Sequence, residues 1–268
     1  TTDMLMDGRH FLLDRDGPEA AGYKAMGVNI SDVAAMAATP RFATVAVALP
    51  RRDSTAVARG LDAGLRRMAE RFSVHIVGGD TNAWDGPLVV SVTLLGETSK
   101  SGAATRSGAK VGDVIFVTGP LGGSLFRGRH LRPVPRVAEA AALLAVGPIH
   151  AMIDLSDGLS SDLGHILQES GGLGALLDGP AVPIHADAVD QAREDGIPAL
   201  LHALNDGEDF ELCFTVPPAT ADRLTTAPPL GVPLHRIGVI DAGPGVRLRS
   251  ADGRTTTVEP GGFDHLRG

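Results

Sequence analysis

The stretch "HAMIDLSDGLSSDLGHIL", residues 150–167, joins an apolar segment to a segment with helical spacing through two acids and a serine. The apolar run 151–153 predicts a buried strand, and the pattern after Gly158 predicts a helix. Asp154, Ser156 and Asp157 lie at the turn between them. A helix cap uses one such side chain, so three exceed that need, although a cap alone is the alternative. Hard oxygen ligands at this density suit Mg²⁺.

The rest of the chain alternates predicted strands with predicted helices. Helices are expected at 17–38, 54–72 and 136–146, and strands at 41–50, 74–80, 87–97, 210–216 and 234–240, with a further strand running into a Gly-rich turn from 113. This order predicts a layered α/β (α+β) fold. A segment rich in Gly, Ser and Ala at 98–113 predicts two domains, 1–105 and 106–268.

Composition excludes several classes of protein. The chain has 268 residues, 43% of them hydrophobic, and no apolar run approaches the ~20 residues that cross a bilayer. The net charge is −8 and no basic stripe occurs, which argues against nucleic acid as the main partner. Cys213 is the single cysteine, so neither an internal disulfide nor a Cys-based zinc cluster is possible, and a cytoplasmic location is expected.

Three further acids interrupt apolar segments: Asp3, Asp32 and Asp80. If the helix around Asp32 is continuous, the carboxylate shares a face with Ala25 and Asn29, and its desolvation requires a cation or hydrogen-bond donors. The alternative is that Ser31 caps a new helix and that Asp32 complements the helix dipole.

Two Gly-rich segments are ambiguous. Gly78 and Gly79 precede Asp80 at the predicted end of a strand, where they allow a close backbone approach or form a simple turn. The segment "TGPLGGS" (118–124) is either a loop that approaches phosphate or a turn into a helix, and it lacks the P-loop pattern. Lysine occurs only at positions 24, 100 and 110, which favours metal ions for neutralising a polyphosphate.

Seven segments occur in the order found in thiamine-monophosphate kinases, which belong to the ATP-binding superfamily that includes aminoimidazole ribonucleotide synthetase. They are "TTDMLMDGRHF", "GYKAMGVNISDVAAMAATP", "HIVGGDTN", "RSGAKVGDVIFVTGPLGGS", "AMIDLSDGLSSDLGHIL", "GEDFELCFTV" and "GGFDHL". The sequence therefore resembles this family over essentially its whole length. The resemblance implies ATP-dependent phosphorylation of thiamine monophosphate to thiamine diphosphate, by direct in-line transfer with several Mg²⁺ ions. It also implies a two-domain fold whose N-terminal domains pair as a barrel in a homodimer.

The resemblance also implies roles for individual residues. The expected metal ligands are Thr1, Thr2, Asp3, Asp32, Asp80, Asp154 and Asp157. The expected ATP contacts are Gly79, Asp80, Arg106 and Ser156, and the expected substrate contacts are His10, Glu208 and Phe263, the last by stacking on an aromatic ring. No acid or base is assigned, because the acceptor is already a phosphate anion. Without the resemblance, a surface or structural role is the favoured interpretation of His10, whereas ordinary packing and a functional role are equally good interpretations of Phe263.

The sequence departs from the family pattern in two places. The family carries a "GDDAA"-type segment with another metal-binding Asp, and this chain begins after the position of that segment. The family also often has an aromatic nucleotide contact where Asp62 stands. Competing interpretations are a selenophosphate synthetase, a hydrogenase-maturation protein, or a non-catalytic nucleotide-binding remnant. The first two rely on a reactive terminal Cys or selenocysteine, whereas Cys213 lies in a predicted strand.

Overall fold

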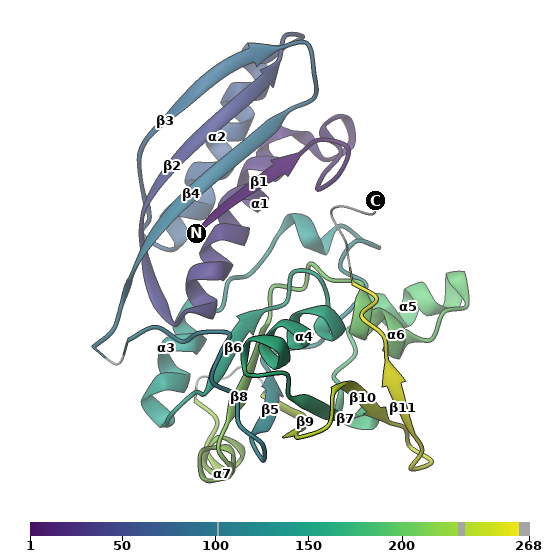
Figure 1. Ribbon diagram of the computed structural model, residues 1–268. Helices are drawn as coiled ribbons and strands as arrows, with labels where there is room; N and C mark the ends of the chain where they lie inside the picture. The colour runs from purple at the N-terminus through teal and green to yellow at the C-terminus, as the bar shows by residue number, and fades with distance from the viewer. Residues whose placement is uncertain (101, 230–233, 263–268) are drawn as a thin grey trace.

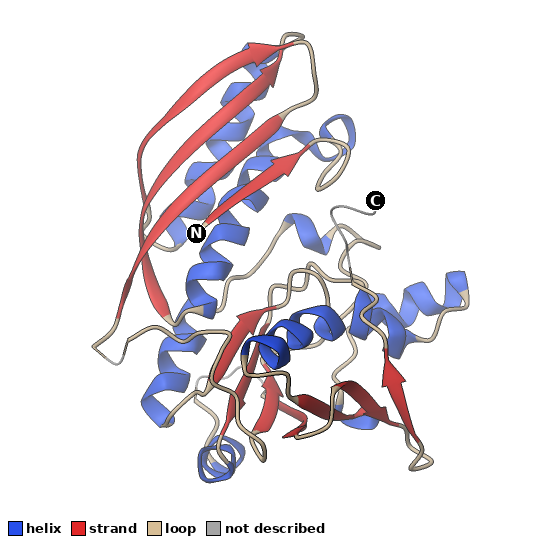
Figure 2. Ribbon diagram, viewed as in Figure 1, coloured by secondary structure: helices blue, strands red, loops and turns tan. Residues whose placement is uncertain are grey.

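Two β-sheets and the helices packed on them make up the molecule, as the computed structural model shows for residues 1–100, 102–229 and 234–262 (Figures 1 and 2). The first sheet holds four strands and the second holds seven. Helices and strands alternate along most of the chain, so the predicted α/β class is confirmed. The sheet changes between Thr98 and Val114, while the division into domains at 105/106 stays a prediction.

The N-terminal sheet has the order β1 (Thr2–Met6), β4 (Val89–Thr98), β2 (Ala38–Pro50) and β3 (His75–Trp84). Strands β2 and β3 are parallel, and the other neighbours are antiparallel. The long helices α1 (Leu13–Ala35) and α2 (Ser54–Arg71) cover one face, as Figure 1 shows. Alternation explains this arrangement: Val90, Val92 and Leu94 are buried beneath the helices, whereas Thr93 and Leu95 face away from them.

Helix α1 begins earlier and ends earlier than the sequence predicts. Gly17 has a non-helical backbone with φ 79°, so the regular part of the helix starts at Pro18, a residue suited to a first turn. The helix ends at Ala35, because Ala38 and the Thr-Pro pair after it already belong to β2. Ser31 lies inside this continuous helix, so the alternative in which it caps a new helix is wrong.

Two glycines allow α1 and α2 to pack closely. A Cβ added at Gly22 would lie 2.2 Å from the carbonyl oxygen of Leu61, and one added at Gly64 would lie 2.0 Å from that of Glu19. Any side chain at either position would therefore push the helices apart. The close packing holds α1 in a fixed position over the sheet, which matters because α1 carries residues of the candidate site.

The C-terminal sheet is covered by helices on both faces. Its order is β11 (Thr255–Val258), β10 (Gly245–Arg249), β7 (Gly174–Asp178), β9 (His235–Asp241), β5 (Val114–Val117), β8 (Leu212–Val216) and β6 (Ala151–Asp154). Helix α4 (Leu159–Glu169) shares one apolar core with α6 (Ala199–Asn205), next to α5 (Ala186–Asp195). Helices α3 (Val137–Val146) and α7 (Pro218–Thr226) share the other core, which Ala35 of α1 also joins.

The structure corrects some predicted elements and adds others. Strand β3 continues to Trp84, so the Gly78-Gly79-Asp80 segment lies within a strand instead of ending one. The elements β7, α5, α6, α7, β10 and β11 were not predicted, and neither were two short 3₁₀ helices at Arg129–Leu131 and Gly179–Ala181. Among the described residues, no helix combines the length and apolar character that a bilayer crossing requires.

Candidate functional site

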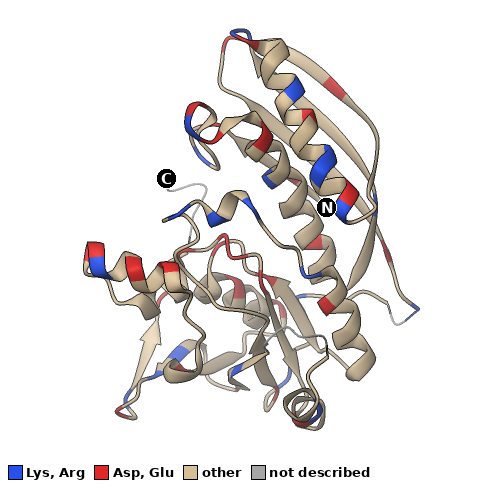
Figure 3. Ribbon diagram, turned by 180° about the vertical axis from the view of Figure 1, so that it is seen from behind, with Lys and Arg blue, Asp and Glu red and all other residues tan. Residues whose placement is uncertain are grey.

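Three carboxylates from distant parts of the chain meet at the boundary between the N-terminal sheet with its helices and the C-terminal sheet. Asp3 comes from β1, Asp32 from the C-terminal half of α1, and Asp154 from the end of β6. The side chains of Asp3 and Asp32 share a hydrogen bond, and the Thr1 hydroxyl also donates to Asp32. Acidic positions are visible along this boundary in Figure 3. We call Asp3, Asp32 and Asp154 the carboxylate cluster.

Burial and the neighbouring carboxylates disfavour the charged form of Asp3 and Asp154. Asp154 is 4% exposed, and burial together with the charge of Asp32 raises its pKa to about 7. Burial and the charges of Asp32 and Asp154 likewise raise the pKa of Asp3 to about 7. Ser31 donates a hydrogen bond of 2.6 Å to Asp154, which favours the ionised form. Within the described ranges, no lysine or arginine forms an ion pair with any of the three.

A cleft of about 400 Å³ opens beside the carboxylate cluster. It gathers most of the residues that the sequence singled out: Thr1, Thr2, Asp3, His10, Asp32, Arg106, Ser156, Asp157 and Glu208. Arg9, Lys24 and Asp206 also line it and were not predicted from the sequence. Asp154 is not one of the lining residues; it is buried and accepts a hydrogen bond from Ser31 of α1, the residue before Asp32. Phe263 lies outside the described residues.

Asp162, which was not predicted as a site or cap residue, caps the turn that follows β6. Asp162, one turn into α4, accepts hydrogen bonds from the backbone N–H groups of Asp157 (3.0 Å) and Gly158 (3.1 Å). These two hydrogen bonds assign Asp162 to the cap of this turn, which weakens the alternative in which Asp154 and Asp157 form only a cap. Metal binding by Asp154 and Asp157 stays a prediction.

Gly79 and Asp80 lie apart from the carboxylate cluster. They line a second cavity of about 270 Å³ between α2, β2 and β3, together with Asp62 and several apolar side chains. Strands β4 and β2 separate β3 from β1, so Asp80 and Asp3 belong to strands roughly 14 Å apart. A Cβ at Gly79 would lie 1.9 Å from the carbonyl oxygen of Val45, so this glycine serves strand packing within the chain. The carboxylate of Asp62 accepts a hydrogen bond from the guanidinium of Arg66.

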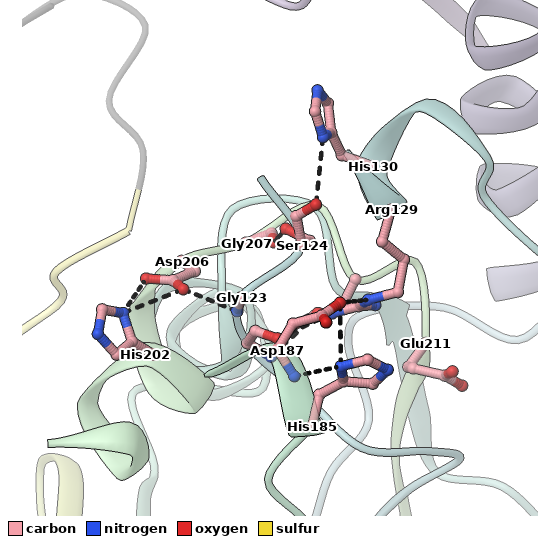
Figure 4. Close-up of polar contacts among 12 residues, drawn as sticks. Gly123, Ser124, Arg129, His130, His185, Asp187, His202, Asp206, Gly207 and Glu211 are labelled. Carbon is pink, nitrogen blue, oxygen red and sulfur yellow. Dashed lines mark hydrogen bonds and ion pairs between the residues drawn. The ribbon is translucent and has the colours of Figure 1, made fainter. Parts of the chain in front are cut away.

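The Gly-rich segment 118–124 is held by acids and leads into no α-helix. The Gly122 N–H donates to both carboxylate oxygens of Asp209 (3.0 Å each), and the Gly123 N–H donates to Asp206 (2.8 Å). Ser124 donates to the carbonyl of Gly207, as Figure 4 shows. These N–H groups are therefore already occupied, and the expectation that they approach a phosphate loses its physical basis.

Arginines neutralise the acids that lie beside the C-terminal sheet. Arg129 pairs with Asp209 at 2.9 Å, and Arg136 pairs with Glu211 through two guanidinium nitrogens. Glu211 also accepts a 2.6 Å hydrogen bond from Thr118. We call Asp206, Asp209 and Glu211 the braced acids. They hold the segment 205–211 against the Gly-rich segment, and Glu208, which lies in that segment, reaches the cleft.

Backbone strain at Glu208 shows that its position is imposed by its surroundings. Glu208 and Phe210 have φ of 54° and 53°, in the left-handed region that non-glycine residues avoid. The Glu208 N–H donates to the Ser156 carbonyl (2.7 Å), and the Phe210 N–H donates to that of Leu155 (2.9 Å). The segment carrying Glu208 is thereby tied to the turn carrying Ser156 and Asp157.

Cys213 lies in the core of the second sheet, as the sequence predicts. It is a free thiol, completely buried in β8, and burial raises its pKa. A buried thiol of this kind is unreactive at neutral pH. This removes Cys213 as the reactive residue on which a selenophosphate synthetase or a hydrogenase-maturation protein would depend.

Comparison with known proteins identifies the family of the chain. Residues 1–98 match the family described as AIR synthase related protein, N-terminal domain. A thiamine-monophosphate kinase of Rhodopirellula baltica is 43% identical over 264 residues, which cover 98% of this chain and 82% of that protein. The chain belongs to the thiamine-monophosphate kinase family. The thiamine-monophosphate kinase of Escherichia coli K12 is 39% identical and covers 99% of this chain and 86% of its own length.

Solved structures of thiamine-monophosphate kinases share this fold. A structure described as AaThiL complexed with AMPPCP and TMP has a TM-score of 0.84 and 31% identity, and the match covers 99% of this chain and 86% of that one. The thiamine-monophosphate kinase of Stenotrophomonas maltophilia has a TM-score of 0.82 and 35% identity, with coverages of 96% and 85%. The hydrogenase maturation protein HypE, complexed with ATP, reaches a TM-score of 0.79 at 21% identity, which shows the fold alone.

Proposed function

We propose that this member of the thiamine-monophosphate kinase family phosphorylates thiamine monophosphate with ATP to give thiamine diphosphate. The observation that carries the proposal is the carboxylate cluster, which adjoins a cleft lined by the expected substrate contacts His10 and Glu208. Family membership and the ATP analogue and TMP bound to AaThiL support the same activity. Direct in-line transfer is the simplest mechanism, because the acceptor is itself an anion and needs no base.

The carboxylate cluster fits Mg²⁺. Its members are hard oxygen donors from three chain segments, they repel one another, and within the described residues no arginine or lysine side chain pairs with them. Asp3, Asp32 and Asp154 would hold the metal together with the hydroxyls of Thr1 and Thr2, and Asp157 would add a ligand at the cleft. When bound, Mg²⁺ neutralises phosphate oxygens and orients them for transfer.

The remaining residues would bind and orient the two substrates. Arg106 is exposed at the cleft, where its guanidinium would pair with phosphate oxygens of ATP, and Ser156 would contact the nucleotide nearby. Gly79 and Asp80 would contact ATP from the second cavity, with Asp80 as a further metal ligand. His10 and Glu208 would contact thiamine monophosphate, and Phe263 would stack on one of its rings.

We further propose that the protein is a homodimer, paired through the open face of the N-terminal sheet. Helices cover one face of that sheet, while Met4, Met6, Phe42 and Leu95 are exposed on the other. An exposed apolar surface of this kind marks an interface. The expected barrel would form when two copies cover each other's open face. A cytoplasmic location, expected for an enzyme with a reduced cysteine, stays a prediction.

Incubation of the purified full-length protein with ATP, Mg²⁺ and thiamine monophosphate tests the proposed reaction. We expect thiamine diphosphate and ADP in equal amounts, which chromatography resolves. Equal amounts also exclude transfer of the phosphoryl group to water. If the protein binds ATP but forms no thiamine diphosphate, the kinase proposal fails and the alternative of a non-catalytic nucleotide-binding protein gains support.

A further inference from the structure

Lys24 is a fully buried charge that the proposed chemistry leaves without a role. It lies in α1 with 1% of its surface exposed, and it is one of the residues that line the cleft. Desolvation of such a charge is costly unless partners meet it, and burial lowers the pKa of Lys24 while Glu208 opposes that shift. Because burial of this charge is costly, we expect the Lys24 side chain to have a specific role.

The partners of Lys24 are the two described residues that are expected to contact thiamine monophosphate. The ammonium donates a 2.6 Å hydrogen bond to the carbonyl oxygen of His10 and forms an ion pair with the carboxylate of Glu208. His10 follows β1, and Glu208 belongs to the strained segment 205–211 beside the C-terminal sheet. One side chain thus connects two segments nearly 200 residues apart in the sequence, those of His10 and Glu208.

Lys24 fixes one group of each partner: the backbone carbonyl of His10 and the carboxylate of Glu208. The Met6 N–H donates to His10 Nδ1 (3.0 Å), so the imidazole is oriented by its own loop while its carbonyl is fixed by Lys24. Glu208 is 21% exposed, so its carboxylate is anchored by Lys24 yet reaches the cleft. A carboxylate held in one orientation loses less conformational entropy when a ligand binds.

We propose that Lys24 is a positioning residue for thiamine monophosphate: by holding Glu208 and the His10 loop together, it presents both to the substrate. The inference rests on the proposed function and deepens it at the substrate end of the cleft. Lys24 acts through its two partners and is not assigned a contact with the transferred phosphoryl group. Its removal therefore affects the binding of thiamine monophosphate and leaves the binding of ATP in place.

Steady-state kinetics of Lys24→Met in the full-length protein tests this. The KM for thiamine monophosphate should rise by about tenfold or more, as expected when a desolvated ion pair loses one partner, with the KM for ATP within about twofold of wild type. The matched control is Lys110→Met, an exposed lysine of the same chain, which should leave both constants unchanged. Equal changes in both KM values, or none, would overturn the proposal.

Lys24→Arg separates positioning from simple charge compensation. Arginine keeps the positive charge, so the protein should fold, but its longer planar group cannot reproduce the placement of a single ammonium. Positioning predicts a KM for thiamine monophosphate raised by about threefold or more. An unchanged KM would show that only the charge matters and would overturn the proposal, and this variant decides the matter if Lys24→Met does not fold. Wild-type protein that makes no thiamine diphosphate would refute the proposed function instead.

Discussion

Asp154 of the carboxylate cluster and Asp209 and Glu211 of the braced acids are all buried, yet they differ in their ion pairs. Asp209 and Glu211 each pair with an arginine, whereas Asp154 has no ion pair among the described residues. Burial and the nearby Asp32 raise the pKa of Asp154 to about 7, although the Ser31 hydroxyl and the charge of Arg106 oppose that shift. Burial raises the pKa of Asp209 to about 6, and there the Arg129 charge and the Gly122 N–H oppose it. Glu211 likewise has Arg136 and Thr118 as partners. The braced acids are compensated within the chain, whereas the cluster is suited to a cation from solution.

The comparison is tested most strongly by Asp154→Asn. Under the proposed function, kcat should fall by about 10²- to 10³-fold, the range seen when one preorganised electrostatic contact is lost. The melting temperature without Mg²⁺ at pH 8 should be unchanged or higher, because the substitution removes a buried charge. Asp252→Asn, in the exposed turn between β10 and β11, is the control and should change neither quantity. An unfolded Asp154→Asn protein would instead assign Asp154 a structural role.

The braced acids should respond to substitution in stability. Arg136→Met leaves the buried Glu211 with only the Thr118 hydroxyl among its described partners, so unfolding free energy should fall by about 3 kcal/mol. Denaturant unfolding measures this change. The double variant Arg136→Met/Glu211→Gln removes both charges and should recover more than half of the loss. If the double variant is as unstable as the single one, the charge of Glu211 is not the cause.

The effect of Mg²⁺ on stability at different pH values tests the carboxylate cluster. Asp3 and Asp154 have pKa values of about 7 in the folded protein, above the ordinary aspartate value of 3.8, so the folded state binds more protons between pH 4 and 7. Their contribution to stability without Mg²⁺ is therefore present below about pH 4 and is lost as the pH rises through 7. Mg²⁺ should raise the melting temperature more at pH 8 than at pH 6. Equal increases would argue against metal binding by the cluster.

Ser31→Ala should give the smallest effect. It removes the hydroxyl that donates to Asp154, so the pKa of Asp154 should rise further and stability should fall by about 1 kcal/mol. The lower limb of the pH–rate profile should move to higher pH, with kcat at pH 8.5 within about threefold of wild type. A profile that does not move would show that Ser31 does not influence the ionisation of Asp154.

The parts of the fold that local pattern determines were predictable. Pro18 and the abundance of alanine after it indicated α1, and the β-branched alternation indicated β2. The Gly78-Gly79-Asp80 segment was misplaced, because only its pairing with Thr44, Val45 and Ala46 shows that the strand continues. Short elements such as α5 and α6 carry little periodicity and were missed.

The candidate site was predictable in its acids but not in its connections. Asp3, Asp32 and Asp154 interrupt apolar segments, which the sequence displays directly. Whether Gly122 meets a phosphate or Asp209 depends on a contact across 87 positions, which no local pattern contains. Lys24 did leave a signal, since it is one of the few lysines and lies within an apolar helix, but its partners are visible only in the folded chain.

Helix α1 fixes the spacing between the two ends of the cleft. Lys24, Val28 and Asp32 all line it at intervals of four residues, so one face of one helix carries both the substrate end and the metal end. Eight residues of helix set these ends about 12 Å apart along the axis. Insertion or deletion of one residue between them would turn Asp32 by about 100° relative to Lys24. A substitution between Lys24 and Asp32 leaves their spacing unchanged. A change in the length of this part of α1 would instead place the substrate end and the metal end on different faces of the helix.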